Sequence, residues 1–110
     1  MGTAAAFTPS GNTVTFTANV AAPAAVQALS STLGGNQYRI INAGSVTVFL
    51  GVGVDAATAN TNAQVISGNA ASIPLLSGTD EILTFTPNAY FTGITSSGTA
   101  TIYVTPGDGM

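Results

Sequence analysis

Apolar and polar residues alternate in short stretches along this chain, with the period of two that is typical of β-strands with one buried face. The pattern is strongest in residues 37–54, where every second residue from Val46 onward is apolar. Residues 42–45 (NAGS) have the composition of a turn. We therefore predict two strands here, paired as a hairpin around which the rest of the chain is organised.

The same alternation predicts further strands, separated by turns rich in Gly, Pro, Asn and Ser. They are residues 13–20, 71–76, 81–86, 90–95 and 99–104, with a shorter candidate at 65–66. Residues 26–29 form either a short strand or one turn of helix, because four residues are too few for the period to decide. Pro74 has no backbone N–H to donate, so its strand belongs at a sheet edge or a bulge. We expect residues 96–98 to form a hairpin loop with Gly98 in the left-handed conformation.

The remaining segments predict loops rather than a helix. Residues 55–63 (DAATANTNA) have no apolar face and are predicted to be an exposed loop, and regular structure is expected to end at residues 106–109. About eight short strands without a convincing helix are typical of an all-β fold. We predict a jelly-roll-like antiparallel β-sandwich at residues 13–110, preceded by an extended arm at residues 1–12.

The composition excludes several classes of function. The chain has 110 residues, which fits one domain, and carries one Arg, four acidic residues, no Lys, no His and no Cys, for a net charge of −3. One Arg cannot neutralise the phosphates of a nucleic acid or the head groups of an anionic membrane. No apolar run approaches the roughly 20 residues of a membrane-spanning helix. Nucleic-acid and membrane partners are therefore not expected.

The chain also has few residues suited to catalysis. Without His, Lys or Cys it lacks the common bases and nucleophiles, and its acids, Asp55, Asp80, Glu81 and Asp108, lie mostly in predicted turns. Residues 51–56 match the dinucleotide-binding pattern G-x-G-x-x-A, but that site needs a helix at this point, and none is predicted. We interpret these glycines as relieving crowding at a strand end or bulge. We expect a non-enzymatic protein without a cofactor.

A metal site is not expected either. Calcium is the least unlikely ligand, because it binds turn carboxylates and loop carbonyls. Asp55, Asn60 and Asn62 do not have the spacing of an EF-hand loop.

The low charge suggests that the protein assembles with other chains. Charged edge strands, above all with Lys, prevent β-proteins from pairing edge to edge, and this chain has no Lys. The edges are therefore either covered within the fold or occupied in an assembly, and we favour an assembly. Arg39 either pairs within the chain with an acid or an aromatic ring, or binds a partner chain's carboxylate in a bidentate manner, with two parallel N–H···O bonds.

Four segments resemble a known group of proteins: TVTFTANV, QYRIINAGSVTVFLGVG, IPLLSGTDEILTFTP and the ending SGTATIYVTPGDGM. Together they resemble small virion structural proteins of tailed bacteriophages. The resemblance implies a capsid decoration (cement) protein, which binds the major capsid protein at the outer surface of the shell and reinforces it. It also implies a homodimer or homotrimer, made in the host cytoplasm and located on the virion.

Two sets of residues follow as candidate binding sites. Residues 1–12 are either a frayed terminus or an arm that inserts Phe7 into a neighbouring molecule, and Pro9 biases Thr8 toward an extended conformation. We take Phe7, Thr8, Pro9 and Arg39 as the candidate partner-binding residues. The alternative function is a tail or head-fibre component that binds host-surface carbohydrate by stacking sugars on exposed tyrosines, namely Tyr38, Tyr90 or Tyr103.

Overall fold

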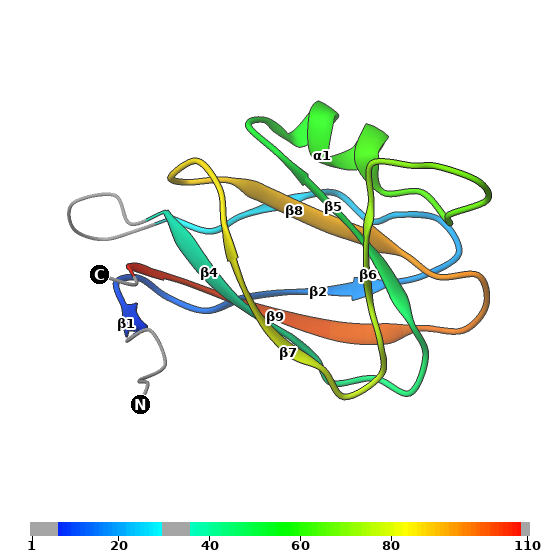
Figure 1. Cartoon of the computed structure of the whole chain (residues 1–110), viewed down its shortest axis with the longest axis horizontal. Coiled ribbons are helices and arrows are strands. Elements are labelled where there is room, and N and C mark those ends of the chain that lie inside the picture. Colours follow the sequence, from blue (N-terminus) through cyan, green and yellow to red (C-terminus); the bar gives the residue numbers. More distant parts are fainter. Residues whose placement is uncertain (1–6, 30–35, 109–110) are drawn as a thin grey trace.

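A computed structural model, which describes residues 7–29 and 36–108, consists of two antiparallel β-sheets packed face to face (Figure 1). The β9 sheet contains β1 (Thr8–Pro9), β2 (Val14–Ala18), β4 (Gln37–Asn42), β7 (Asp80–Thr84) and β9 (Ala100–Asp108). The β5 sheet contains β3 (Val26–Gln27), β5 (Val48–Gly53), β6 (Ile73–Leu75) and β8 (Tyr90–Ile94). The prediction of an all-β sandwich is confirmed.

The order of the strands is that of a jelly roll. The β9 sheet runs β2–β9–β4–β7, with β1 on the same side of β9 as β2, and the β5 sheet runs β3–β8–β5–β6. The antiparallel pairs β5–β6, β4–β7, β3–β8 and β2–β9 are nested in the sequence, as if one long hairpin had been rolled up. β6, which contains Pro74, lies at a sheet edge as predicted.

The predicted hairpin at residues 37–54 is wrong, although both of its strands exist. β4 pairs with β7 and β9, whereas β5 pairs with β6 and β8 in the opposite sheet. The connection therefore crosses between the sheets. The same correction applies to residues 96–98: Gly98 has the expected positive φ of 77°, but the loop joins β8 to β9 across the sandwich. A period of two identifies the buried face of a strand, but it does not show which other strand lies beside it.

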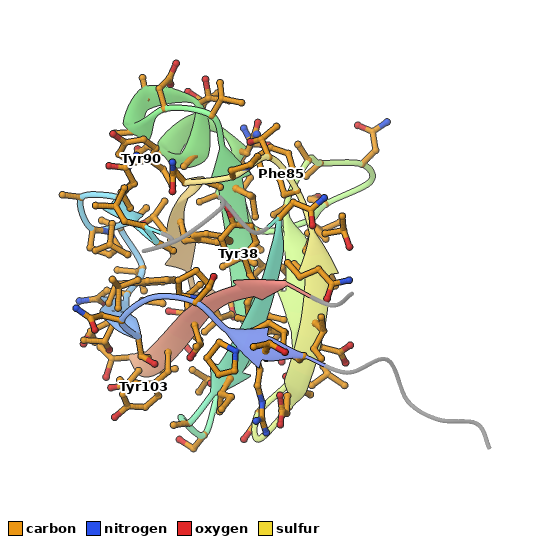
Figure 2. All side chains as sticks on the ribbon, turned by 90° about the vertical axis from the view of Figure 1, so that its left-hand side faces the viewer. Tyr38, Phe85, Tyr90 and Tyr103 are labelled. Carbon is orange, nitrogen blue, oxygen red and sulfur yellow. The ribbon has the colours of Figure 1, made fainter. Side chains whose placement is uncertain are left out.

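The inner faces of the two sheets form one core, and Tyr38 lies at its centre (Figure 2). The ring of Tyr38 packs edge-on against Phe91, with a centroid distance of 4.8 Å. Its hydroxyl donates to the carbonyl of Thr86 (2.5 Å) and accepts from the amide of Ala89 (3.0 Å). This polar group is thus buried with its hydrogen bonds made.

The prediction of an exposed loop at residues 55–63 is wrong, because α1 (Ala56–Asn62) forms there. Asp55 caps the helix, since its carboxylate accepts a hydrogen bond from the amide of Thr58 (2.8 Å). Ala59 is the only buried residue of the helix, which explains why the sequence shows no apolar stripe. α1 lies on the outer face of the β5 sheet, over β5 (Figure 1).

The glycines of the G-x-G pattern make room for this helix. A Cβ atom on Gly51 would lie 2.2 Å from the carbonyl oxygen of Ala59, and one on Gly53 would lie 2.4 Å from the amide nitrogen of the same residue. The glycines thus relieve crowding, as interpreted from the sequence, but against the backbone of a helix that the sequence did not predict. Close approach of α1 to β5 needs Gly at both positions.

The extent of several strands also differs from the prediction. β2 ends at Ala18, and Val20 is 57% exposed instead of buried, because Asn19 leaves the sheet and bridges to Ile94 of the other one. Residues 65–66 form no strand. β9 continues through Pro106 to Asp108. The backbone of Pro106 faces the break between β1 and β2, so its missing N–H removes no ladder bond. At this break the amide of Ser10 donates to the carbonyl of Pro106 (2.9 Å).

Candidate functional site

The outer face of the β9 sheet is the candidate site, because the other sheet is covered on its outer side. There α1 packs on β5, and the segment around Pro23 is fixed by hydrogen bonds to its carbonyl from Thr92 Oγ1 (2.8 Å) and Asn60 Nδ2 (3.2 Å). In Figure 2, Tyr103 points away from the molecule on the side opposite α1. We call the outer surface of the β9 sheet the bare face.

The bare face is almost uncharged. Side-chain alternation and strand register place on it Thr13, Thr15, Thr17, Gln37, Arg39, Ile41, Asp80, Ile82, Thr84, Thr101, Tyr103 and Thr105. Tyr103 is 41% exposed and Ile82 is 46% exposed. Tyr103 stands between Thr15 on β2 and Ile41 on β4. The bare face therefore consists of a few apolar side chains surrounded by threonines.

The two charges of the bare face neutralise each other. Arg39 Nη2 lies 2.5 Å from Asp80 Oδ2, and Nε lies 3.0 Å from Oδ1. Arg39 stands directly opposite Ile82, and Ile41 directly opposite Asp80, so the ion pair joins diagonal neighbours on β4 and β7. One of the two interpretations of Arg39, an ion pair with an acid of its own chain, is thus observed. Its role toward a partner chain stays a prediction.

These contacts predict how stability depends on pH. The guanidinium of Arg39 lowers the pKa of Asp80, and the Thr58 amide lowers the pKa of Asp55, whereas burial raises the pKa of Tyr38. Because the carboxyl pKa values are lowered in the folded state, the stabilisation from each charged carboxylate is fully present above the unfolded-state pKa. It is lost as the pH falls through the folded-state pKa. The raised tyrosine pKa means that stability is lost as the pH rises through it.

We therefore expect the free energy of unfolding to be nearly constant from about pH 5 to pH 9 and to fall on either side. Urea titrations across the pH range measure this profile. Asp80→Asn should flatten the acid side, and Tyr38→Phe should flatten the alkaline side. An alkaline decline of equal size in Tyr38→Phe would contradict the assignment to Tyr38.

The described part of the predicted arm lies against the sheet. Thr8 and Pro9 form β1, pair with the end of β9 and are exposed. A Cβ atom on Gly107 would lie 2.5 Å from Cζ of Phe7, so the ring of Phe7 covers this glycine. Because the side chain of Pro106 is buried in the core, Gly107 faces the bare face, and Phe7 therefore lies there too. Residues 1–6 lie outside the described residues.

The structure thus brings the four predicted partner-binding residues to one end of one sheet. Pro9 pairs with Gly107, and Arg39 pairs with Thr105, two residues away on the same strand. The sequence missed Ile41 and Ile82 as site residues, and it indicated Tyr103 only as a residue that could stack on carbohydrate. Their outward positions follow from the strand alternation, but the sequence did not show which outer face stays uncovered.

The tyrosines proposed for carbohydrate stacking are not gathered in one place. Tyr38 is completely buried, so the expectation that it could be an exposed stacking residue is wrong. Tyr90 lies near α1 and Tyr103 lies on the opposite side of the molecule (Figure 2). The tyrosines therefore form no common platform.

The polar residues considered for a metal site have structural partners. Asp55 caps α1, Asn60 donates to Pro23, and Asn62 Nδ2 donates to the carbonyl of Val52 (3.0 Å). Among residues 7–29 and 36–108, no three His, Cys, Asp or Glu side chains lie close enough together to hold a metal ion. That part of the chain also has no helix with the length and apolar character needed to cross a bilayer.

No protein-family model matches the chain, and no curated protein matches it significantly.

Proposed function

We propose that this protein is a non-enzymatic virion structural protein that binds the outer surface of a phage capsid and reinforces it. The resemblance to small virion proteins suggests the major capsid protein as its partner. The observation that carries the proposal is the bare face, an uncovered sheet surface with one internally neutralised ion pair. A jelly roll suits this role, since viral capsid domains also use it.

The composition of the bare face fits a protein–protein interface. The buried centres of such interfaces are enriched in aromatic residues and Arg and depleted of Lys, Glu and Asp. Tyr103, Ile41 and Ile82 supply the apolar contact, and the threonines around them can hydrogen-bond to a partner. Only one ion pair has to be desolvated when such a surface is covered, and the mutual attraction of Arg39 and Asp80 offsets part of that cost.

The arm adds a second contact at the end of this face. Phe7 packs over Gly107, while the exposed Thr8 and Pro9 extend the sheet beside it. In the proposed complex, Phe7, Thr8, Pro9 and Arg39 contact the capsid together with Tyr103.

Acidic substitutions on the bare face test the proposal. Tyr103→Asp and Ile82→Asp should each weaken binding to capsids about tenfold or more, because each would bury an unpaired charge in the contact. Val54→Asp is the matched control, since Val54 is an exposed apolar residue that follows β5 in the other sheet. Binding is measured by co-sedimentation with capsids of the encoding phage that lack the protein. Equal binding by all three variants would contradict the bare face as the capsid contact.

Deletion of residues 1–12 tests the arm separately. We expect the truncated chain to keep its circular dichroism spectrum and to lose capsid binding. Full occupancy of capsids by the truncated chain would show that the arm is not needed.

Cryo-electron microscopy of the virion then locates the protein, and density anywhere other than the outer shell would refute the proposal.

The alternative, carbohydrate binding by a tail or head fibre, gains no support from the positions of the tyrosines. With Tyr38 buried and Tyr90 and Tyr103 far apart, we expect a glycan array to show no binding above background. Specific binding that Tyr103→Ala abolishes would favour the alternative instead.

A further inference from the structure

We infer that the free edge of β2 pairs with β2 of a second copy of this chain, in antiparallel orientation. The backbone directions in the β9 sheet show which groups are free to do so. In an antiparallel strand, the backbone groups of successive residues point to opposite neighbours. The amide of Ala43 donates to the carbonyl of Thr101 (2.9 Å), on the β4 side. The carbonyl of Ile102 accepts from Thr15 Oγ1 (2.9 Å), on the β2 side.

The register then identifies the free groups of β2. Ile102 stands opposite Phe16, so Phe16 and its alternate neighbours Val14 and Ala18 use their backbone groups to bond β9. The N–H and C=O groups of Thr15 and Thr17 therefore point away from β9. Among the described residues, β2 has no second strand as a neighbour, and both threonines are exposed.

β2 is also the one edge in the described chain without a feature that blocks pairing. Proteins protect sheet edges with charges, prolines and very short strands. β7 begins with Asp80 and Glu81, β6 contains Pro74, β1 contains Pro9, and β3 has two residues. β2 (VTFTA) is five residues long and uncharged.

A second copy is the partner that fits this edge. A twofold interface brings the same surface together from both chains, so the surface must be complementary to itself. With Phe16 at the centre, Thr15 of each chain stands opposite Thr17 of the other, and their free backbone groups face each other. Cross-strand threonine pairs stabilise a sheet, and no like charges meet there despite the net charge of −3.

Exposed apolar residues flank the edge at both ends. Val20 is 57% exposed and Leu29 is 56% exposed. A Cβ atom on Gly11 would lie 2.2 Å from the carbonyl oxygen of Leu29, so Leu29 lies beside the start of β2. Both residues lie outside β2 itself, so they border its free edge without forming part of the paired strands.

The pairing would join two β9 sheets into one continuous sheet and place the two bare faces side by side. Thr15 neighbours Tyr103, so the tyrosines of both chains would stand on the same surface. The dimer can exist in the absence of any capsid and does not depend on the proposed function.

Charge substitution at the two threonines tests the pairing. We expect the full-length protein to sediment as a dimer at about 100 µM in analytical ultracentrifugation, and a monomer there would overturn the inference. Thr15→Lys/Thr17→Lys and Thr15→Glu/Thr17→Glu should each be monomeric, because like charges then face each other across the twofold axis. An equimolar mixture should restore the dimer. A dimer of either variant alone, or a mixture that stays monomeric, would contradict this register.

A backbone substitution provides an independent test. Thr17→Pro removes a free edge N–H without removing a bond to β9 and should weaken the dimer about tenfold or more. Thr84→Pro is the matched control on β7, because Thr84 stands opposite Gln37, whose backbone bonds β9, and its own N–H therefore points to the outer edge. Thr84→Pro should leave the dimer unchanged. If it weakened the dimer instead, β7 would be the interface and the inference would be wrong.

Discussion

Gly51→Ala should lower the free energy of unfolding by about 3 kcal/mol and the melting temperature by at least about 10 °C. The added Cβ would lie 2.2 Å from the carbonyl oxygen of Ala59 and 2.6 Å from the amide nitrogen of Ala63. Both contacts are with helix backbone, so no side-chain rotation can relieve them, and α1 has to move off β5. Urea denaturation measures the loss, and hydrogen exchange of the α1 amides shows whether it begins at the helix.

Gly68→Ala is the matched control for this prediction. Gly68 has a φ of +95°, and a Cβ atom there would have no neighbour within 4 Å. The substitution should therefore cost only the backbone strain of about 1 kcal/mol. If Gly51→Ala cost no more than Gly68→Ala, close packing of α1 on β5 would not be the reason for the glycine.

Asn42→Ala should lower the free energy of unfolding by about 3–5 kcal/mol, because it would remove the hydrogen-bond partner of one buried and two partly buried backbone groups. Asn42 is completely buried at the end of β4. Its Nδ2 donates to the carbonyls of Val46 (3.0 Å) and Leu75 (2.9 Å), and its Oδ1 accepts from the amide of Gly44 (2.9 Å). One side chain thus ties the crossing between the sheets to β6.

Asn60→Ala is the control for Asn42→Ala. Asn60 is exposed, and its Nδ2 makes a bond of 3.2 Å to the carbonyl of Pro23. That carbonyl also accepts from Thr92 Oγ1, so it keeps a partner after the substitution. We expect a loss below about 1 kcal/mol in urea denaturation. A similar loss in both variants would mean that the buried hydrogen bonds of Asn42 contribute no more to the free energy of unfolding than an exposed one.

Asn42 and Ser77 also show why the jelly roll can form with so few charges. The crossing after β4 and the turn before β7 are fixed by backbone bonds, in which Asn42 donates to the carbonyl of Thr79 and accepts from the amide of Gly78, both at 3.0 Å. Ser77 Oγ donates to the carbonyl of Gly44 (2.8 Å) between the same two segments. Polar but neutral side chains therefore satisfy the backbone at this crossing without adding charge.

The alternation of side chains predicted the local structure well. Eight of the described strands overlap segments whose period of two marked them as strands, or whose length left strand as one interpretation, as at residues 26–29. Pro74 indicated an edge, and Gly98 indicated a left-handed turn, because each residue restricts its own backbone. Arg39 was correctly given an acidic partner within the chain as one of its two interpretations.

The sequence did not predict α1, because the stability of this helix comes from outside its own residues. The helix has seven residues and one buried side chain, and it depends on the Asp55 cap and on the surface of Gly51 and Gly53. A short helix is marginal by its own propensity and needs tertiary contact. The candidate site was missed for the same reason, since α1 determines which sheet is covered and which face stays bare.

By itself, the sequence determined the class of fold, the inward and outward sides of most strands and the low charge of the surface. The tertiary structure alone decided which strands pair, because alternation assigns a side chain to a face and carries no information about the neighbouring strand. It also decided that the strands of residues 37–54 belong to opposite sheets, and that Phe7, Arg39 and Tyr103 share one surface. These are contacts between segments far apart in the chain, and they form only when the core is buried as a whole.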